Sequence, residues 1–121
     1  MAFTELSPGQ VADWAAQVRA AGQTPVVLDV REDFEIEASA VDTQAAQQGF
    51  AMLYMPMWQI PQRLKDLPDE EAPLALLCHH GQRSVMVAHF LADHGYENLY
   101  NITGGIDNWS RFDPAVPRYV K

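Results

Sequence analysis

The 121-residue sequence has only one cysteine, Cys78, so no disulfide can form within the chain. Small secreted domains usually carry several cysteines, whereas a low number of cysteines is typical of proteins in a reducing compartment. The first ten residues, MAFTELSPGQ, have neither a basic start nor an apolar run, so we expect no secretory signal. No apolar stretch approaches the roughly 20 residues that span a bilayer. These absences favour a cytoplasmic protein.

Positive charge is also scarce. Eight Lys and Arg residues stand against 16 Asp and Glu, which gives a formal net charge of -8. Such a surface repels nucleic acid phosphates and anionic membranes, so we expect neither as a partner. The densest group of side chains that can carry positive charge is His79, His80 and Arg83, directly beside the thiol.

Hydrophobic residues make up 48 % of the chain, enough to fill one core, and the length suits a single domain over residues 1–121. Five short runs predict strands. They cover residues 3–6, 26–30, 50–55, 73–78 and 98–102. Continuous apolar strands are typical of parallel sheets that are covered on both faces.

The segments between these runs carry helix signals. Residues 7–22 have Ser7 as a candidate N-cap and Pro8 at the first helical position. Residues 83–95 predict a second helix that ends at a glycine cap, and residues 104–112 predict a short third one. The face that we expect the second helix to bury consists of Val85, Ala88, Leu91 and Ala92.

Two further segments have mixed patterns. Residues 32–48 are polar and predict a helical turn or a loop, and residues 56–68 contain three prolines and predict at most a short helix. The alternation of strands and helices predicts an α/β domain with a five-stranded, mostly parallel sheet and helices on both faces.

Cys78 is expected at the carboxyl end of a strand, where binding sites of α/β sheets lie. The helix that follows would direct its positive end and its free backbone amides at the sulfur, and Gly81 would permit the tight turn. Arg83 and protonated His79 or His80 would add positive charge. This pattern predicts an anion-binding loop with a nucleophilic thiolate at its floor.

Other interpretations of Cys78 remain. A lone cysteine is usually a small buried hydrophobic residue, although such a residue needs no neighbouring arginine or histidine pair. Cys78, His79 and His80 are also possible metal ligands, but three consecutive residues rarely converge on one ion. We therefore expect no metal and no cofactor. A redox-sensing cysteine is a third possibility.

The segment CHHGQRS (residues 78–84) follows PLALL, with VVLDVRE upstream and NITGGIDNW downstream. In this combination the sequence resembles the single-domain form of the rhodanese homology domain, from about Pro25 to the C-terminus. The resemblance implies a sulfurtransferase in which Cys78 carries a persulfide. It also implies that the loop binds the outer sulfur and the donor, which is thiosulfate or a protein persulfide; the acceptor is cyanide or a thiol. The implied substrate-binding residues are His79, His80, Gly81, Gln82 and Arg83.

The resemblance has informative departures. Four residues separate Cys78 from Arg83, whereas related phosphatases have five, so the loop favours sulfur over phosphate. Thiosulfate-active members often have Lys or Arg where His79 and His80 stand, so thiosulfate turnover is expected to be weak or to rise at lower pH. Tyr54 stands where the family commonly has a histidine. An alternative function is a non-catalytic module that binds a partner or senses oxidants.

The remaining distinctive residues have structural interpretations. Asp29 and Arg31 predict an ion pair, Ser84 predicts a helix start with a hydroxyl that can face the loop, and residues 66–73 predict a solvated acidic loop. The side chains that we expect to pack in the interior are Trp14, Met52, Met55, Met57, Trp58 and Trp109.

Overall fold

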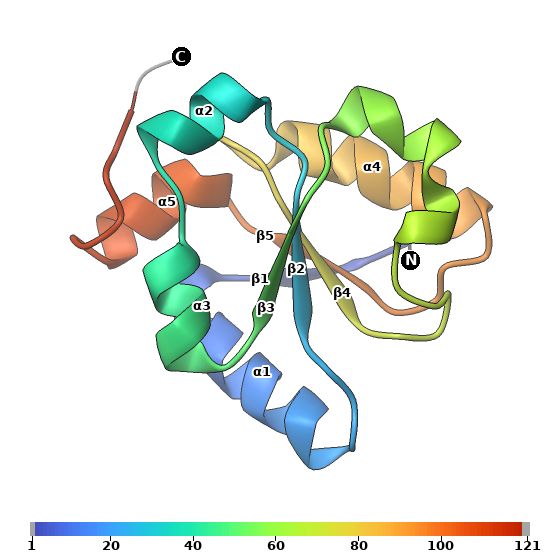
Figure 1. The fold of residues 1–121 in the computed structure, drawn as a ribbon. Helices are drawn as coiled ribbons and strands as arrows, with labels where there is room; N and C mark the ends of the chain where they lie inside the picture. Colours follow the sequence, from blue (N-terminus) through green and yellow to red (C-terminus); the bar gives the residue numbers. More distant parts are fainter. Residues whose placement is uncertain (1, 120–121) are drawn as a thin grey trace.

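The computed structural model describes residues 2–119, apart from the side chain of Thr43, and its centre is a five-stranded sheet (Figure 1). All neighbouring strands are parallel, in the order β1-β5-β4-β2-β3. The strands are β1 (Thr4–Leu6), β2 (Val26–Asp29), β3 (Ala51–Tyr54), β4 (Leu74–Leu77) and β5 (Leu99–Ile102). The predicted α/β fold and all five predicted strands are confirmed.

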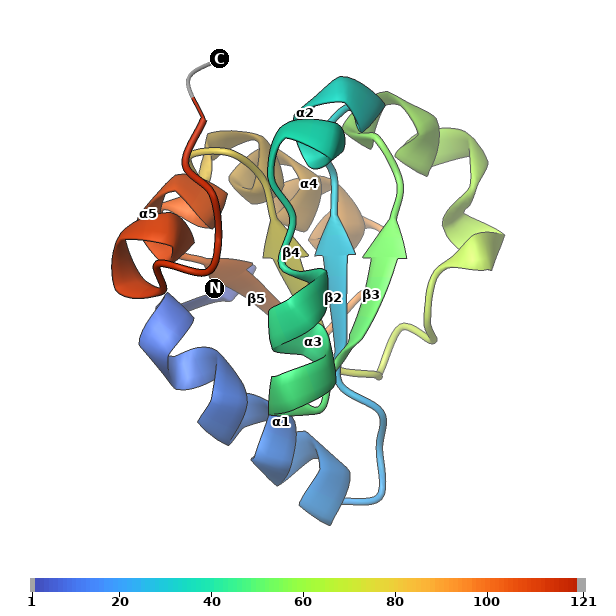
Figure 2. The ribbon, with the colours of Figure 1, turned by 60° about the vertical axis from the view of Figure 1, so that its left-hand side comes forward.

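Helices cover both faces of the sheet, as Figures 1 and 2 show from two directions. One face packs against α1 (Val11–Ala20), α3 (Asp42–Gln48) and α5 (Gly105–Phe112). The other face packs against α4 (Gln82–Asp93) and the 3-10 helix η2 (Met57–Gln62). Successive strand residues therefore bury in opposite layers, because side chains alternate along a strand.

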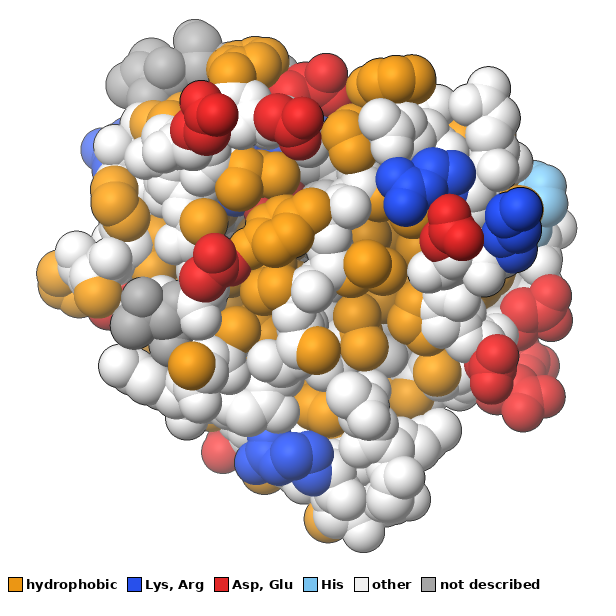
Figure 3. Space-filling model, in the orientation of Figure 1, with side chains coloured by type: hydrophobic (Ala, Val, Ile, Leu, Met, Phe, Trp, Pro, Cys, Tyr) orange, Lys and Arg blue, Asp and Glu red, His pale blue; other side chains and the backbone are white. Residues whose placement is uncertain are grey.

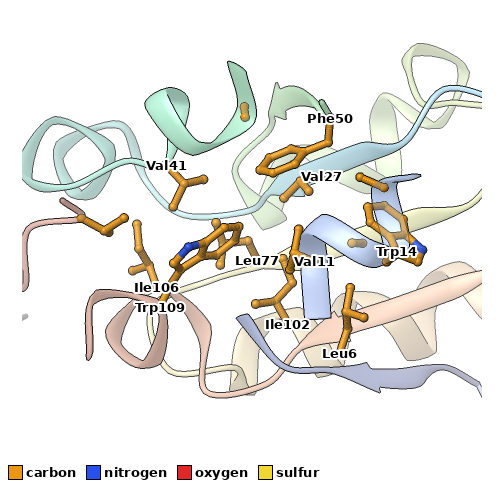
Figure 4. Close-up of a cluster of buried hydrophobic side chains, with 14 of the residues drawn as sticks. Leu6, Val11, Trp14, Val27, Val41, Phe50, Leu77, Ile102, Ile106 and Trp109 are labelled. Carbon is orange, nitrogen blue, oxygen red and sulfur yellow. The ribbon is translucent and has the colours of Figure 1, made fainter. Parts of the chain in front are cut away.

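The layer under α1, α3 and α5 contains two of the tryptophans (Figure 4). Trp109 is fully buried and its ring lies 6.0 Å from that of Phe50, while Trp14 is 6 % exposed. Val27 and Leu77 line the same layer from the sheet. Burial of Trp14 and Trp109 is thus confirmed.

Residues 32–48, where a helical turn or a loop was expected, form two short helices. These are α2 (Asp33–Ala38) and α3. The backbone N–H of Glu32 donates to Glu35 Oε1 at 3.2 Å, which supports the start of α2. In α3, Gln44 is buried and donates to Asp113 at 2.9 Å, so a tertiary contact supports a helix that its polar sequence does not predict.

The proline-containing segment forms 3-10 turns, namely η2 and η3 (Leu64–Asp66), and a further 3-10 turn, η1 (Pro8–Gln10), precedes α1. The expected packing of Trp58 is wrong, because its side chain is 62 % exposed. A 3-10 helix has three residues per turn, so Met57 and Ile60 share the inward face and Trp58 points away. Met55 is fully buried, and Met52 and Met57 pack against the two core layers as expected.

The buried face of α4 is rotated from the expected one. Val85 and Ala92 are only partly buried, whereas Ser84 and Val87 join Ala88 and Leu91 in the interior. The rotation turns the Ser84 hydroxyl toward Cys78, 3.3 Å from its sulfur. A buried hydroxyl on a helix face is not predicted by hydrophobic spacing alone.

The surface has partly exposed apolar areas. β3 is an edge strand with incompletely covered side chains, and Figure 3 shows hydrophobic side chains over this part of the molecule. The four acidic residues of segment 66–73 are exposed, as expected for an acidic loop; they are Asp66, Asp69, Glu70 and Glu71. Among residues 2–119, no helix combines the length and the apolar character needed to cross a membrane.

Candidate active site

Cys78 lies directly after β4, at the carboxyl edge of the sheet. The Val30 backbone N–H donates to the Leu77 carbonyl at 2.9 Å, so β2 holds the end of β4 in place. Cys78 is only 1 % exposed and its side chain packs in the layer under α4. The predicted position of the thiol between a strand and a helix is therefore observed.

Three polar groups surround the Cys78 sulfur. The backbone N–H of Gly81 lies 3.0 Å from Sγ, that of Ser84 lies 3.4 Å away, and the Ser84 hydroxyl lies 3.3 Å away. Gly81 has φ +92°, a conformation that glycine adopts without strain, and α4 begins at the next residue. The loop amides and the start of α4 thus form a site that stabilises negative charge on sulfur.

A second helix start supports the loop from behind. The N–H groups of Ile106 and Asp107 donate to the carbonyls of Cys78 (2.8 Å) and His79 (3.0 Å). A Cβ atom on Gly105 would lie 2.4 Å from the Cys78 carbonyl oxygen and 2.5 Å from that of His79. Gly105 is therefore required because the start of α5 meets the loop after Cys78 backbone to backbone.

A hollow of about 260 Å³ opens above the sulfur and brings together five of the six predicted site residues. They are Cys78, His79, His80, Gln82 and Arg83. The sixth, Gly81, contributes its backbone amide. A larger hollow of about 450 Å³ lies between η3 and the acidic loop, but its lining includes no cysteine or histidine.

Arg83 has a partner that the sequence analysis missed. Its guanidinium makes two hydrogen bonds of 2.7 Å to the carboxylate of Glu35, which is fully buried. Burial alone would raise the pKa of Glu35, but the hydrogen bonds and charge of Arg83, together with the Glu32 amide and Tyr119, lower it to about 2. The positive charge expected from Arg83 is therefore largely compensated.

The two histidines of the loop have different environments. His79 is 2 % exposed, and its ring stacks on Tyr119 with centroids 4.1 Å apart. Burial, and then the neighbouring His80, lower the pKa of His79, so it is neutral near pH 7. The side chain of His80 is 58 % exposed, and its Nδ1 lies 3.9 Å from an Asp107 oxygen. Of the two, only His80 exposes much of its ring to a ligand in the hollow.

Tyr119 connects the loop to the neighbouring ion pairs. Its hydroxyl donates to Glu35 at 3.0 Å and accepts from Arg31 at 3.1 Å, and its carbonyl faces His79 Nε2 at 3.1 Å. Burial raises the pKa of Tyr119 to about 12, so the hydroxyl keeps its proton. The only sequence signal for this role is a tyrosine near the C-terminus, which is too weak to predict it.

The predicted ion pair of Asp29 and Arg31 is confirmed. The two side chains are fully buried and lie 2.7 Å apart. Arg31 also donates to the carbonyls of Glu35 (3.3 Å) and Ser39 (2.8 Å). The pair therefore anchors α2, and with it the carboxylate that holds Arg83.

Asn101 is another buried polar residue that the sequence analysis did not single out. It lies on β5 and accepts a hydrogen bond from the Ser84 hydroxyl. Its only sequence signal is an amide side chain inside the apolar stretch of residues 99–102. In the part of the chain that the structure describes, no group of three or more His, Cys, Asp or Glu side chains is arranged to hold a metal ion.

Comparisons with known proteins agree with this arrangement. The family model of the Rhodanese-like domain matches residues 11–112. Thiosulfate sulfurtransferase GlpE of Actinobacillus succinogenes is 32 % identical over 111 residues, which cover 92 % of this chain and 87 % of the relative. GlpE of Haemophilus influenzae is 29 % identical and covers 96 % of both chains.

A solved structure supports the fold separately. A rhodanese-related protein from Thermoplasma volcanium superposes with a TM-score of 0.72 and 22 % identity, over 97 % of this chain and 100 % of that one. The resemblance inferred from the cysteine loop and the Gly-Gly segment is confirmed. The chain belongs to the Rhodanese-like domain family.

Proposed function

We propose that the protein is a sulfurtransferase that moves a sulfane sulfur from a donor, through a persulfide on Cys78, to a thiophilic acceptor. The observation that carries this proposal is the pair of backbone amides at 3.0 and 3.4 Å from Cys78 Sγ, at the floor of an open hollow. The GlpE relatives, which are named thiosulfate sulfurtransferases, support the same chemistry.

In the first half-reaction, the Cys78 thiolate attacks the outer sulfur of the donor. A new S–S bond forms, the donor's S–S bond breaks, and sulfite leaves with the bonding electron pair when the donor is thiosulfate. In the second half-reaction, cyanide or a thiolate attacks the outer sulfur of the persulfide, which releases thiocyanate or a new persulfide and restores the Cys78 thiolate.

We assign the binding of the outer sulfur and the donor to residues 79–83. The Gly81 amide and the start of α4 stabilise the negative sulfur, and His80, Gln82 and Arg83 line the entrance. The loop of residues 79–83 has little net positive charge, because Glu35 compensates the charge of Arg83 and His79 is neutral. This favours a donor that needs little charge recognition, such as a protein persulfide, alongside slow turnover of thiosulfate.

The acceptor must come from outside, because a chain with one cysteine cannot resolve the persulfide as an internal disulfide. We propose the cytoplasm as its compartment, since a free reactive thiol suits reducing conditions. Neither nucleic acid nor a membrane is proposed as a partner, given the net charge of -8.

The test is intact-protein mass spectrometry before and after thiosulfate, and again after cyanide. The expected result is a gain of one sulfur atom, its loss on cyanide, and release of thiocyanate. The Cys78→Ser protein is the control and should stay folded without gaining sulfur. Sulfur transfer by Cys78→Ser would refute the assignment of the nucleophile.

The alternative is a module that binds a partner or senses oxidants without turnover. Repeated cycles separate the two functions, because an enzyme releases many equivalents of thiocyanate per protein and returns to the free thiol. A single modification of Cys78 that is never released would favour the sensor. If thiosulfate adds no sulfur, a persulfide-carrying protein is the next donor to test.

A further inference from the structure

β5 carries a buried polar side chain, Asn101, that the proposed sulfur transfer does not itself use. It is 2 % exposed, and a buried amide needs partners at both ends. Its Nδ2 lies 3.1 and 3.3 Å from the two carboxylate oxygens of Glu5 and 3.5 Å from the Gly81 carbonyl oxygen. Its Oδ1 accepts a hydrogen bond from the Ser84 hydroxyl.

These partners fix the orientation of the amide. The carboxylate of Glu5 and the carbonyl of Gly81 only accept hydrogen bonds, so the end of Asn101 that faces them must be the NH2 group. The opposite end, which faces Ser84, must therefore be the carbonyl oxygen.

The Ser84 hydroxyl has a single proton and two neighbours that compete for it. Asn101 Oδ1 accepts that proton, while Cys78 Sγ lies 3.3 Å from the same oxygen. The oxygen consequently turns a lone pair toward the sulfur. A thiol can donate its S–H to this lone pair, whereas a thiolate would face it without a hydrogen bond.

The hydroxyl therefore opposes the effect of the loop amides. The N–H groups of Gly81 and Ser84 favour the thiolate, and the Ser84 oxygen favours the thiol. If the hydroxyl turned to the sulfur, the buried Oδ1 of Asn101 would lose its donor, which carries a free-energy cost. Asn101 thus disfavours the thiolate whether the Ser84 hydroxyl points to Asn101 or turns to the sulfur.

The charged side chains around Cys78 largely compensate one another. Arg83, on α4, approaches the sulfur but is paired with Glu35 from α2. Glu5, on β1, is exposed and is separated from the sulfur by the amide of Asn101.

The same holds on the side of α5 and the C-terminal segment. Asp107, at the start of α5, faces His80, and it also pairs with Arg111 and Arg118. His79 is neutral against Tyr119, whose hydroxyl remains protonated. These pairings leave little net charge facing the sulfur, so the nearest unpaired influences are the dipoles of the loop amides and of the Ser84 hydroxyl.

We propose that Asn101 is a positioning residue that holds the Ser84 hydroxyl proton away from Cys78 and so disfavours the thiolate of the free enzyme. The role rests on Cys78 being the sulfur carrier proposed above. Once the outer sulfur is bound, the negative charge lies on that sulfur, near the loop amides, and Sγ no longer needs a donor from Ser84. Asn101 therefore favours the loaded form over the free thiolate.

The test is the pH dependence of thiolate formation at Cys78, followed by ultraviolet absorbance and by the rate of alkylation with iodoacetamide. The chain has one cysteine and four tyrosines, so the absorbance is read as the difference from Cys78→Ser, which removes the contribution of ionising tyrosines, and the alkylation rate reports the single thiol. Asn101→Leu removes the acceptor at similar size, and the freed Ser84 hydroxyl can then donate to the thiolate. We expect the midpoint to fall by about one pH unit, which gives about tenfold more thiolate below the midpoint.

The Ser84→Ala background shows whether Asn101 acts through the hydroxyl. There Asn101→Leu should cause no further shift, whereas an equal shift in both backgrounds, or none in either, would overturn the proposal. Ser84→Ala alone gives a second sign test: the midpoint should stay or fall, and a rise would mean that the hydroxyl already donates to sulfur in the unmodified protein. Asn101→Val replaces the leucine variant if that variant does not fold.

These titrations contain no sulfur donor, so they can fail independently of the proposed function. If the midpoints shift as expected but neither thiosulfate nor a persulfide-carrying protein leads to thiocyanate release, sulfur transfer from these two donors is refuted. The positioning of the hydroxyl by Asn101 would still stand. Thiocyanate release with unchanged midpoints would support the transferase and refute the role of Asn101.

Discussion

Gly105 lies so close to Cys78 that a Cβ atom at this position would meet the Cys78 carbonyl oxygen at 2.4 Å. The same carbonyl accepts the Ile106 N–H at 2.8 Å, so the start of α5 is bonded directly to the loop that holds the sulfur. This contact gives a physical reason for the association of the CHHGQRS and NITGGIDNW segments.

Gly105→Ala is expected to destabilise the fold by about 3 kcal/mol or more, since both the backbone contact and the φ of +63° oppose a side chain. Gly22→Ala is the matched control. Gly22 also has a positive φ, +82°, but a Cβ atom placed there would have no neighbour within 4 Å, so the cost should be only about 1 kcal/mol. Chemical denaturation of both variants measures the difference, and equal losses would contradict the close contact.

Glu35 should make the stability of the protein depend on acid pH. Its folded-state pKa of about 2 lies below the ordinary 4.5, so its stabilisation is fully present above pH 4.5 and is lost as the pH falls toward 2. We expect Glu35→Gln to lower the free energy of unfolding at pH 7 by about 2 kcal/mol, and the gap to close in that acid window. Glu37→Gln, an exposed change on the same helix, should alter stability by less than about 0.5 kcal/mol at pH 7.

Removing one partner of the buried ion pair between Asp29 and Arg31 should lower stability much more than the same change in an exposed ion pair. Asp29→Asn leaves Arg31 buried without a counter-charge, and we expect a loss of about 3 kcal/mol. Asp66→Asn breaks the exposed pair with Arg63, where both side chains are more than two-fifths accessible, and should cost at most about 0.5 kcal/mol. Thermal unfolding of the two variants, side by side, checks the contrast.

A permanent charge at His80 should improve the use of thiosulfate. His80→Lys adds a cation at the exposed edge of the hollow, and we expect kcat/KM for thiosulfate to rise roughly fivefold, with a smaller gain at high salt. His94→Lys makes the same change in net charge at the other end of α4. If both variants gave the same gain, the effect would come from the overall charge of the protein and not from a charge beside the hollow above Cys78.

Local patterns in the sequence were sufficient to predict the strands and the place of Cys78. The apolar runs are short and end at the same edge of the sheet, so the order of elements puts the thiol at the carboxyl end of β4. The contacts of Glu35 were not predictable in this way, because its partner Arg83 is 48 residues away. Nothing in the polar segment around Glu35 distinguishes it from its exposed acidic neighbours.

The exposure of Trp58 was not predicted, and the burial of Ser84, whose hydroxyl was expected to be able to face the loop, has a related explanation. Trp58 is exposed because its segment has the three-residue repeat of a 3-10 helix, and hydrophobicity alone does not reveal that repeat. Ser84 is buried because Cys78 and Asn101 satisfy its hydroxyl. Hydrophobic spacing along the sequence does not reveal a polar residue that is buried because its hydrogen-bond partner lies far away in the sequence. In this protein several such residues surround the thiol.

Contacts from both ends of the described chain converge on the cysteine loop. Glu5 bonds to Asn101 over 96 residues of sequence, and Tyr119 bonds to Glu35 over 84. During synthesis, Tyr119 appears 40 residues after His79, so a nascent chain carries its cysteine before the loop has all its supports. The order of translation therefore delays the finished sulfur site until the C-terminal segment has emerged and folded back.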